Sequence, residues 1–219
     1  MSPDASERRD VGRDLLPHLL ARFDPARRTV IGIAGESGSG KSVTSTGLAR
    51  TLDASGWPTV VLHLDNYFVR PPRTNHEHRL LDLANVGPHE VDLARLEGDV
   101  AAFRAGAAGV RAPVVDYPGN RFVEEVISFA GSQVLIVEGT WALHLGDLDV
   151  RILLDATHED TLERRRERNR DIDAPIMRDI LAIEHTLVAP MRAKADIVID
   201  RHFAISHASP AVPPASPSQ

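Results

Sequence analysis

The sequence predicts an α/β fold in which a parallel sheet of about five strands is covered by helices on both faces. Short apolar runs rich in valine, isoleucine and leucine recur along the chain, and segments with a helical spacing of apolar residues separate them. Strands buried on both faces read as such continuous apolar runs, because no position along them faces water. The alternation of the two kinds of segment is typical of strands joined by crossover helices.

The predicted elements follow in order, beginning with an amphipathic helix over residues 6–23. Strands are expected at 28–35, 59–65, 133–139, 149–155 and 195–200, with a shorter one inside 112–122. Helices are expected at 41–54, 91–103, 157–171 and 174–194. Residues 66–90 show no period and are expected to form a loop, which at this length usually has a function. The predicted organisation is an N-terminal helix (1–24), one main domain (25–203) with a helical lid at about 157–175, and a disordered tail (204–219) rich in Pro, Ser and Ala.

The composition excludes several classes of function. Lys and Arg number 25 against 31 Asp and Glu, a formal net charge of -6, so nucleic acid and anionic membranes are not expected as partners. The absence of cysteine excludes disulfides, thiolate metal sites and thiol catalysis. No apolar stretch has the length of a signal peptide core or a membrane span. We therefore expect a cytoplasmic protein with a small-molecule partner, and leave open whether it forms a homo-oligomer.

A glycine-rich motif lies between the first predicted strand and the helix that follows it. The sequence GESGSGKS matches GxxxxGK[ST] in full, in the strand–turn–helix context that the motif requires. Its backbone N–H groups and the helix N-terminus would hold phosphate oxygens, Lys41 would reach the β- and γ-phosphates, and the Ser42 hydroxyl would ligate magnesium. The motif predicts a P-loop NTPase fold that binds ATP and Mg²⁺ through Gly35, Glu36, Ser37, Gly38, Ser39, Gly40, Lys41, Ser42 and Val43.

Two carboxylates follow predicted strands and should lie at the same edge of the sheet as this loop. Asp65, in HLDNYF, could orient an acceptor hydroxyl, accept its proton and support magnesium. The alternative for Asp65 is a turn or helix cap. Glu138, after VLIV, is a candidate for the magnesium shell, and its alternative is an ordinary acid at a strand end.

The segment ERRRERNR carries five arginines: Arg164, Arg165, Arg166, Arg168 and Arg170. They are too many for one helix face, so some must face solvent, while others could close over the triphosphate and neutralise charge in the transition state. The alternative is a solvated face with Glu163 and Glu167 as ion-pair partners. The histidines at 76, 78 and 89 lack the spacing of a zinc site, so substrate contacts or plain loop positions are expected for them.

From about Thr29 to Asp200 the chain resembles the uridine kinase and phosphoribulokinase group of P-loop kinases. The segments that carry the resemblance are IGIAGESGSGKS, HLDNYF, PVVDYPGNRF, VLIVEGT, ERRRERNRD and KADIVID. The resemblance implies that Asp65 contacts the acceptor hydroxyl and the metal, and that Glu138 belongs to the magnesium shell. It also implies that Arg165, Arg168 and Arg170 belong to a lid that closes on ATP, with Arg165 and Arg168 acting in catalysis.

Departures from this group concern the substrate. Where uridine kinases carry Asp-His-Pro, with an aspartate that holds the ribose hydroxyls, this chain reads NVGP from Asn85 to Pro88. Asn120 replaces a histidine near the pyrimidine, and Val115 replaces one aromatic of the base pocket, although Tyr117 remains. The segment RTNHEHR, from Arg73 to Arg79, offers Arg and His side chains that would suit an anionic or polyhydroxylated acceptor, and the alternative for it is a solvated loop. The candidate substrate residues are Asp65, Tyr67, Phe68, Arg73, His78, Asn85, Tyr117, Asn120 and Arg121.

The leading hypothesis is an ATP-dependent kinase that phosphorylates a hydroxyl of a small metabolite, with uridine or cytidine as the first acceptor. A sugar phosphate or another small alcohol, as in phosphoribulokinase or pantothenate kinase, is the alternative acceptor. A second class is a non-catalytic nucleotide switch, because DYPG at residues 116–119 matches a DxxG element, although the guanine-reading NKxD motif is absent. A third is a scaffold protein that has kept only the loop.

Overall fold

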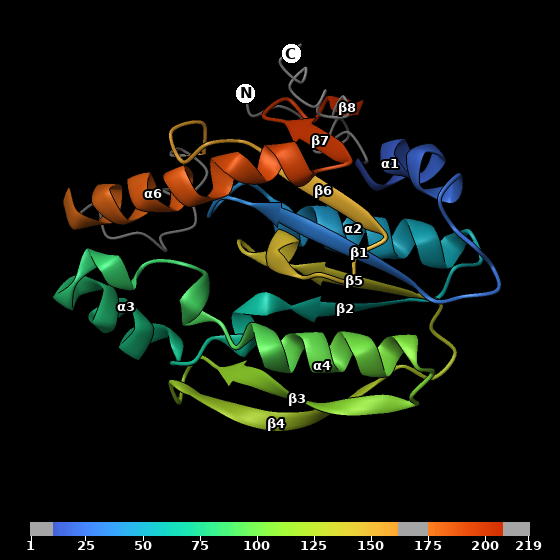
Figure 1. The fold of residues 1–219 in the computed structure, drawn as a ribbon, viewed down its shortest axis with the longest axis horizontal. Coiled ribbons are helices and arrows are strands. Elements are labelled where there is room, and N and C mark those ends of the chain that lie inside the picture. Colours follow the sequence, from blue (N-terminus) through green and yellow to red (C-terminus); the bar gives the residue numbers. More distant parts are fainter. Residues whose placement is uncertain (1–10, 162–174, 208–219) are drawn as a thin grey trace, which may run out of the picture.

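The computed structural model describes residues 11–161 and 175–207, and its central feature is a sheet of six strands in the order β2-β5-β1-β6-β7-β8 (Figure 1). The strands are β1 Thr29–Gly35, β2 Thr59–His63, β5 Val134–Glu138, β6 Val150–Asp155, β7 Ile197–Asp200 and β8 Ile205–His207. The first five pair in parallel, and only β8 runs antiparallel, against β7. The predicted parallel sheet of about five strands is confirmed.

Helices cover both faces of this sheet, as the apolar strands require. The α-helices are α1 Val11–Leu20, α2 Lys41–Ala54, α3 Pro72–Leu81, α4 Leu93–Arg104 and α6 Pro175–Val188. The 3₁₀ turns are η2 Leu64–Tyr67, η3 Leu83–Asn85, η4 Pro88–Glu90, η5 Ala142–His144 and η6 Ala189–Lys194. Successive strand side chains point to opposite faces, so Ile31 and Ile33 pack with α1 and α2, while Val30 and Ala34 pack with α4 and the 3₁₀ turns. Because these strands are parallel, their carboxyl ends lie at the same edge of the sheet.

The segment 66–90, which was expected to be a loop, is instead largely helical. It contains the end of η2, all of α3, and the short turns η3 and η4. Helix α3 begins with Pro72, whose fixed φ and missing N–H suit the first turn of a helix. Its last two leucines, Leu80 and Leu81, are 46% and 82% exposed, so it buries no apolar stripe that the sequence could have revealed.

A two-stranded antiparallel hairpin stands apart from the main sheet. Strands β3 Gly109–Asp116 and β4 Arg121–Ser128 pair along their full length, where the sequence indicated one short strand and a turn. DYPG is the turn of this hairpin, and Asp116 accepts hydrogen bonds from the Gly119 N–H and from Arg121 Nε. These contacts hold the pKa of Asp116 below its usual value. The Asp and Gly of the DYPG motif are therefore explained by the hydrogen bonds of the hairpin turn.

The two ends of the domain also differ from expectation. Residues 205–207, assigned to the disordered tail, form strand β8 and extend the sheet by one strand. The expected lid helix over residues 157–171 lies outside the described residues beyond Thr161, as do Arg165, Arg168 and Arg170. Of the helices that the structure describes, none combines the length and apolar character needed to cross a membrane.

Candidate active site

The predicted phosphate loop connects β1 to α2 and has the conformation that its glycines predict. Gly35 has a φ of 153° and Gly40 has a φ of 102°, values that residues with a Cβ rarely adopt. A Cβ on Gly35 would stand 2.7 Å from the Leu154 carbonyl oxygen and 2.8 Å from Ser39 Oγ. The loop therefore reaches its tight turn only because this position carries no side chain.

Replacing Gly35 with alanine should lower ATP affinity at least tenfold and destabilise the protein by about 2 kcal/mol, because both backbone strain and a clash result. The matched control is Gly47→Ala on α2, where a Cβ meets nothing within 4 Å. Alanine is favoured over glycine inside a helix, so this control should gain up to about 1 kcal/mol. Thermal melts and calorimetric ATP titration of both variants measure the contrast, and equal effects would refute it.

Lys41 lies at the start of α2 with its ammonium group folded over the loop. Its Nζ donates to the carbonyl oxygens of Gly35 at 2.9 Å and of Glu36 at 3.0 Å. Ser39 Oγ is buried beside it and has no hydrogen-bond partner within the described chain. An ammonium group and an unpaired hydroxyl on a glycine-rich loop fit the oxygens of a polyphosphate.

Glu138, at the end of β5, joins the loop to the neighbouring strand. Its Oε1 accepts from Ser42 Oγ at 3.2 Å and lies 2.6 Å from Nδ1 of His63, which ends β2. The hydrogen bond to Glu138 raises the pKa of His63. The hydroxyl of Ser42 and the carboxylates of Glu138 and Asp65 are hard oxygen donors of the kind that Mg²⁺ prefers, so this corner fits the ion implied by the sequence.

Asp65 lies in η2, directly after β2, rather than within the strand. Its side chain opens onto the pocket, and the protein atoms packed around it raise the pKa of its carboxyl group above the usual value, an effect that Lys41 opposes. A carboxylate with a raised pKa beside a cation is suited to accepting a proton.

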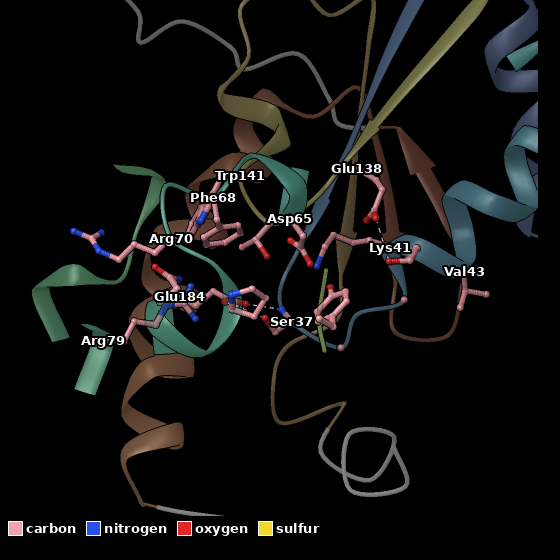
Figure 2. Close-up of a pocket in the computed structure, with 17 residues that line it drawn as sticks. Ser37, Lys41, Val43, Asp65, Phe68, Arg70, Arg79, Glu138, Trp141 and Glu184 are labelled. Carbon is pink, nitrogen blue, oxygen red and sulfur yellow. Dashed lines mark hydrogen bonds between the residues drawn. The ribbon is translucent and has the colours of Figure 1, made fainter. Parts of the chain in front are cut away.

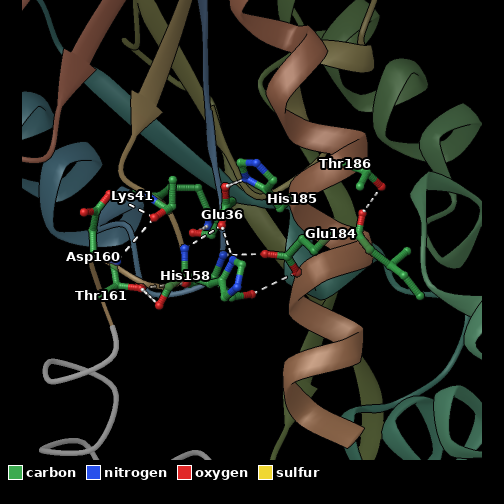
Figure 3. A network of polar contacts seen from close by, with 11 residues as sticks. Glu36, Lys41, His158, Asp160, Thr161, Glu184, His185 and Thr186 are labelled. Atoms are coloured by element: carbon green, nitrogen blue, oxygen red, sulfur yellow. Dashed lines mark hydrogen bonds and ion pairs between the residues drawn. The ribbon is translucent and has the colours of Figure 1, made fainter.

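A polar clamp, formed by Glu36 and Ser37 with His158, Thr161, Glu184 and His185, fastens the loop to two other parts of the chain (Figure 3). The buried Glu36 carboxylate accepts from the His158 N–H at 2.6 Å and lies 2.6 Å from Nδ1 of His185 on α6. Glu184 accepts from the N–H and the hydroxyl of Ser37. The clamp holds the loop to the chain just before residues 162–174 and to the helix after them.

A pocket of about 370 Å³ lies at this edge of the sheet. Figure 2 shows Phe68, Trp141 and Arg70 toward one side of it, Lys41 and Glu138 toward the other, and Asp65 between them. The lining residues are Ser37, Gly38, Gly40, Lys41, Ser42, Val43, Asp65, Phe68, Arg70, Pro72, Asn75, Arg79, Tyr117, Glu138, Thr140, Trp141 and Glu184. The pocket thus joins the phosphate loop to Phe68, Trp141 and helix α3.

Ten of the sequence-predicted residues line this pocket: Ser37, Gly38, Gly40, Lys41, Ser42, Val43, Asp65, Phe68, Tyr117 and Glu138. Gly35, Glu36 and Ser39 belong to the loop behind it. Several candidate substrate residues lie elsewhere and bond to protein instead. Tyr67 is buried and donates to Asp99 at 2.7 Å, and burial raises its pKa.

Apart from Arg121, the other substrate candidates outside the pocket lining fasten α3 to its surroundings. Asn120 Oδ1 accepts from the Arg73 N–H at 2.9 Å, and its Nδ2 donates to Thr74 at 3.1 Å. Asn85 Nδ2 donates to the His78 carbonyl oxygen at 2.8 Å. Arg121 pairs with Asp116 in the hairpin turn. These residues position the pocket wall.

Sequence reasoning missed six of the residues that line the pocket, which are Arg70, Pro72, Asn75, Thr140, Trp141 and Glu184. Arg79, also in the lining, belongs to the segment 73–79 whose Arg and His side chains the sequence analysis singled out. Asn75 carried no signal, because helix α3 was not predicted. Trp141 lies three residues after Glu138, so the rule that sites lie at the carboxyl ends of strands could have found it. Glu184 lies within an amphipathic helix and read as an ordinary polar position.

Known proteins are similar to this chain in sequence and in fold. The model of the phosphoribulokinase/uridine kinase family matches residues 30–205. A uridine kinase of Staphylococcus haemolyticus is 31% identical over 186 residues, which are 80% of this chain and 88% of that protein. A bifunctional alpha-galactosidase/sucrose kinase of Mediterraneibacter gnavus is 28% identical over 188 residues, 80% of this chain but only 20% of that protein's length.

Among solved structures, a possible uridine kinase from Bacillus stearothermophilus superposes with a TM-score of 0.63 at 21% identity, covering 87% of this chain and 97% of that one. This likeness shows the fold. The extent of the family match, together with the loop between β1 and α2, settles the family. The chain belongs to the phosphoribulokinase/uridine kinase family, whose members are kinases that phosphorylate a hydroxyl group.

Proposed function

We propose that this protein transfers the γ-phosphoryl group of ATP to a hydroxyl group of a small molecule. The observation that carries the proposal is that Asp65, Lys41 and Glu138 line one pocket together with the phosphate loop. A bond forms between the acceptor oxygen and the γ-phosphorus, and the bond from that phosphorus to the β–γ bridging oxygen breaks. ADP leaves, and the proton of the hydroxyl passes to Asp65.

The residues of the pocket divide this work between positioning and charge stabilisation. The loop N–H groups and Lys41 would hold the phosphates and stabilise charge on the transferring group. Ser42, Asp65 and Glu138 would hold Mg²⁺, which supplies charge neutralisation when bound. We assign Arg165, Arg168 and Arg170 to a lid that closes on ATP and excludes water, a role that rests on the sequence resemblance.

Two classes of acceptor stand out for this pocket. The relatives named uridine kinase keep uridine and cytidine as candidates, which the sequence analysis placed first. The relative that includes a sucrose kinase makes a sugar the second candidate. Both classes present hydroxyl groups, so the same chemistry at Asp65 serves either.

The test is ADP release by the purified protein with Mg·ATP and a panel of nucleosides, sugars, sugar phosphates and pantothenate-like alcohols. We expect acceptor-dependent ADP release, with a product heavier by one phosphoryl group. Lys41→Met should abolish it, while Arg50→Met, on the exposed side of α2 and outside the active-site pocket, should not. Nucleotide binding without transfer to any acceptor would favour the switch, and a competition between ATP and GTP would then identify its nucleotide.

A further inference from the structure

We propose that Glu36, His158 and His185 form a binding site for a divalent transition-metal ion such as Zn²⁺, separate from the magnesium corner of the pocket. Among the residues that the structure describes, they are the only group of three or more histidine and acidic side chains whose ligand atoms all lie within 4.8 Å of one another. They come from three parts of the chain: the phosphate loop, the segment after β6, and α6. The site does not depend on the kinase function proposed above.

The ligand atoms of the cluster converge on one carboxylate. Glu36 Oε1 lies 2.6 Å from Nδ1 of His185, and Oε2 lies 3.3 Å from Nδ1 of His158. Figure 3 shows the two imidazoles on either side of this carboxylate. Zinc bonds of about 2.0–2.2 Å in a tetrahedral site separate the ligand atoms by about 3.3–3.6 Å, so an ion needs side-chain shifts of only about 1 Å. Oε2 also accepts from the His158 N–H at 2.6 Å, which leaves Oε1 for the metal.

An ion can reach this cluster from solvent. The side chains of His185 and His158 are 43% and 20% exposed, whereas that of Glu36, at the base of the cluster, is 7% exposed. The two imidazoles therefore form the open side of the site, and the carboxylate forms its floor. Three protein ligands leave the fourth position of a tetrahedral ion to water, so we expect the ion to exchange with solvent.

The charge around the cluster favours a cation. Glu36 is 5% exposed, and Glu184, which accepts from the Ser37 N–H next to it, is 2% exposed. In the part of the chain that the structure describes, no lysine or arginine forms an ion pair with either carboxylate, and the histidines beside Glu36 are charged only when protonated. Buried charges are normally paired or bound to a metal. A divalent ion would supply the missing positive charge.

The ligand types select the class of ion. Imidazole nitrogen suits zinc, copper, nickel and iron, whereas Mg²⁺ prefers oxygen ligands. The chain has no cysteine, so no thiolate competes for such an ion. We therefore expect Mg²⁺ and Zn²⁺ to bind at different places: Mg²⁺ near Ser42 and Glu138, and Zn²⁺ at Glu36 and the two histidines.

The deciding experiment titrates the full chain, without a histidine tag, first with Co²⁺ and then with Zn²⁺. Nucleotide is omitted because a triphosphate chelates both ions, and excess Mg²⁺ occupies the magnesium corner. We expect a visible absorption band that saturates at one Co²⁺ per chain and disappears when Zn²⁺ replaces the cobalt. Zn²⁺ should also raise the melting temperature, because it binds the folded state. Absence of saturable one-to-one binding would overturn the inference.

Substitutions locate the ion. His158→Gln and His185→Gln should each weaken Co²⁺ binding at least tenfold, because one of three ligands is lost. Glutamine can still donate a hydrogen bond to Glu36, so the polar clamp keeps its contact, and melts without metal check that each variant is folded.

Two histidine variants outside the cluster are the matched controls. His18 Nδ1 lies 2.9 Å from Nε2 of His207, and His63 lies beside Glu138, so each is a paired histidine outside the proposed site. His18→Gln and His63→Gln should bind Co²⁺ as the wild type does. Loss of binding in either control, with binding kept in His158→Gln and His185→Gln, would place the ion elsewhere and overturn the inference.

Discussion

Replacing Asp65 with asparagine is expected to lower kcat about a thousandfold while changing the affinity for ATP less than about threefold. Asparagine keeps the size and the hydrogen-bonding oxygen of the side chain but cannot accept a proton. We assign phosphate binding to Lys41 and the loop rather than to this carboxylate, so the nucleotide should still bind. Steady-state kinetics and calorimetric ATP titration measure the two effects. A variant with nearly normal kcat would refute the assignment of Asp65 as the proton acceptor.

The pH dependence of kcat/KM provides a second test of the role of Asp65. Packing by the surrounding protein raises the pKa of Asp65 above 3.8, so the protonated form persists to higher pH than for an ordinary aspartate. Only the ionised form can take the acceptor proton. We expect kcat/KM to fall as the pH drops through this raised pKa, and the residual activity of Asp65→Asn to lack that limb. Asp53→Asn, an exposed aspartate beyond the pocket, should retain the wild-type profile.

Replacing Glu90 with alanine is expected to cost about 3 kcal/mol of unfolding free energy. This buried carboxylate satisfies Asn75, the Gly87 N–H and the guanidinium of Arg79, whose side chain is only 18% exposed. The substitution leaves a mostly buried cation and two buried donors without an acceptor. Because Asn75 and Arg79 belong to α3, the wall of the pocket should loosen as well, and KM for the acceptor should rise more than KM for ATP.

Glu124→Ala is the matched control for Glu90→Ala. Glu124 also pairs with an arginine, Arg95, at 2.8 Å, but the two side chains are 42% and 39% exposed. Ion pairs so open to water contribute little, so the control should change stability by less than about 1 kcal/mol. Chemical denaturation of the two variants compares a buried pair with an open one. Equal losses would mean that Glu90 contributes nothing beyond an ordinary ion pair.

The parts of the fold that the sequence predicted well are those that depend on burial and on local chain chemistry. Helix α2 has the predicted bounds, because the phosphate motif marks its start and the Gly56 turn follows its end. The parallel strands were visible because both of their faces are buried. Of the hairpin, the sequence indicated one short strand and the turn but not the second strand. Helix α3 was not visible, since it is held by single contacts of Asn75, Arg73 and Asn120 rather than by a periodic apolar face.

The candidate site divides in the same way, into a part that the sequence predicted and a part that it did not. The nucleotide half consists of consecutive residues whose spacing is visible in the sequence, and Asp65 and Glu138 follow from their place after strands. The rest of the pocket is assembled from α3, the turn after β5, and α6, which are distant in the chain. Trp141 reads as a core residue because its burial is real, and only the structure shows that it also lines the pocket.

The attachment of Glu36 and Ser37 to His158 on one side and to α6 on the other has a thermodynamic consequence. The described residues on either side of the segment 162–174, His158 before it and Glu184 and His185 after it, all bond to the phosphate loop. If ATP strengthens that grip by some factor, linkage requires the gripped state to bind ATP more tightly by the same factor. A change at either histidine would then alter nucleotide affinity without touching the nucleotide.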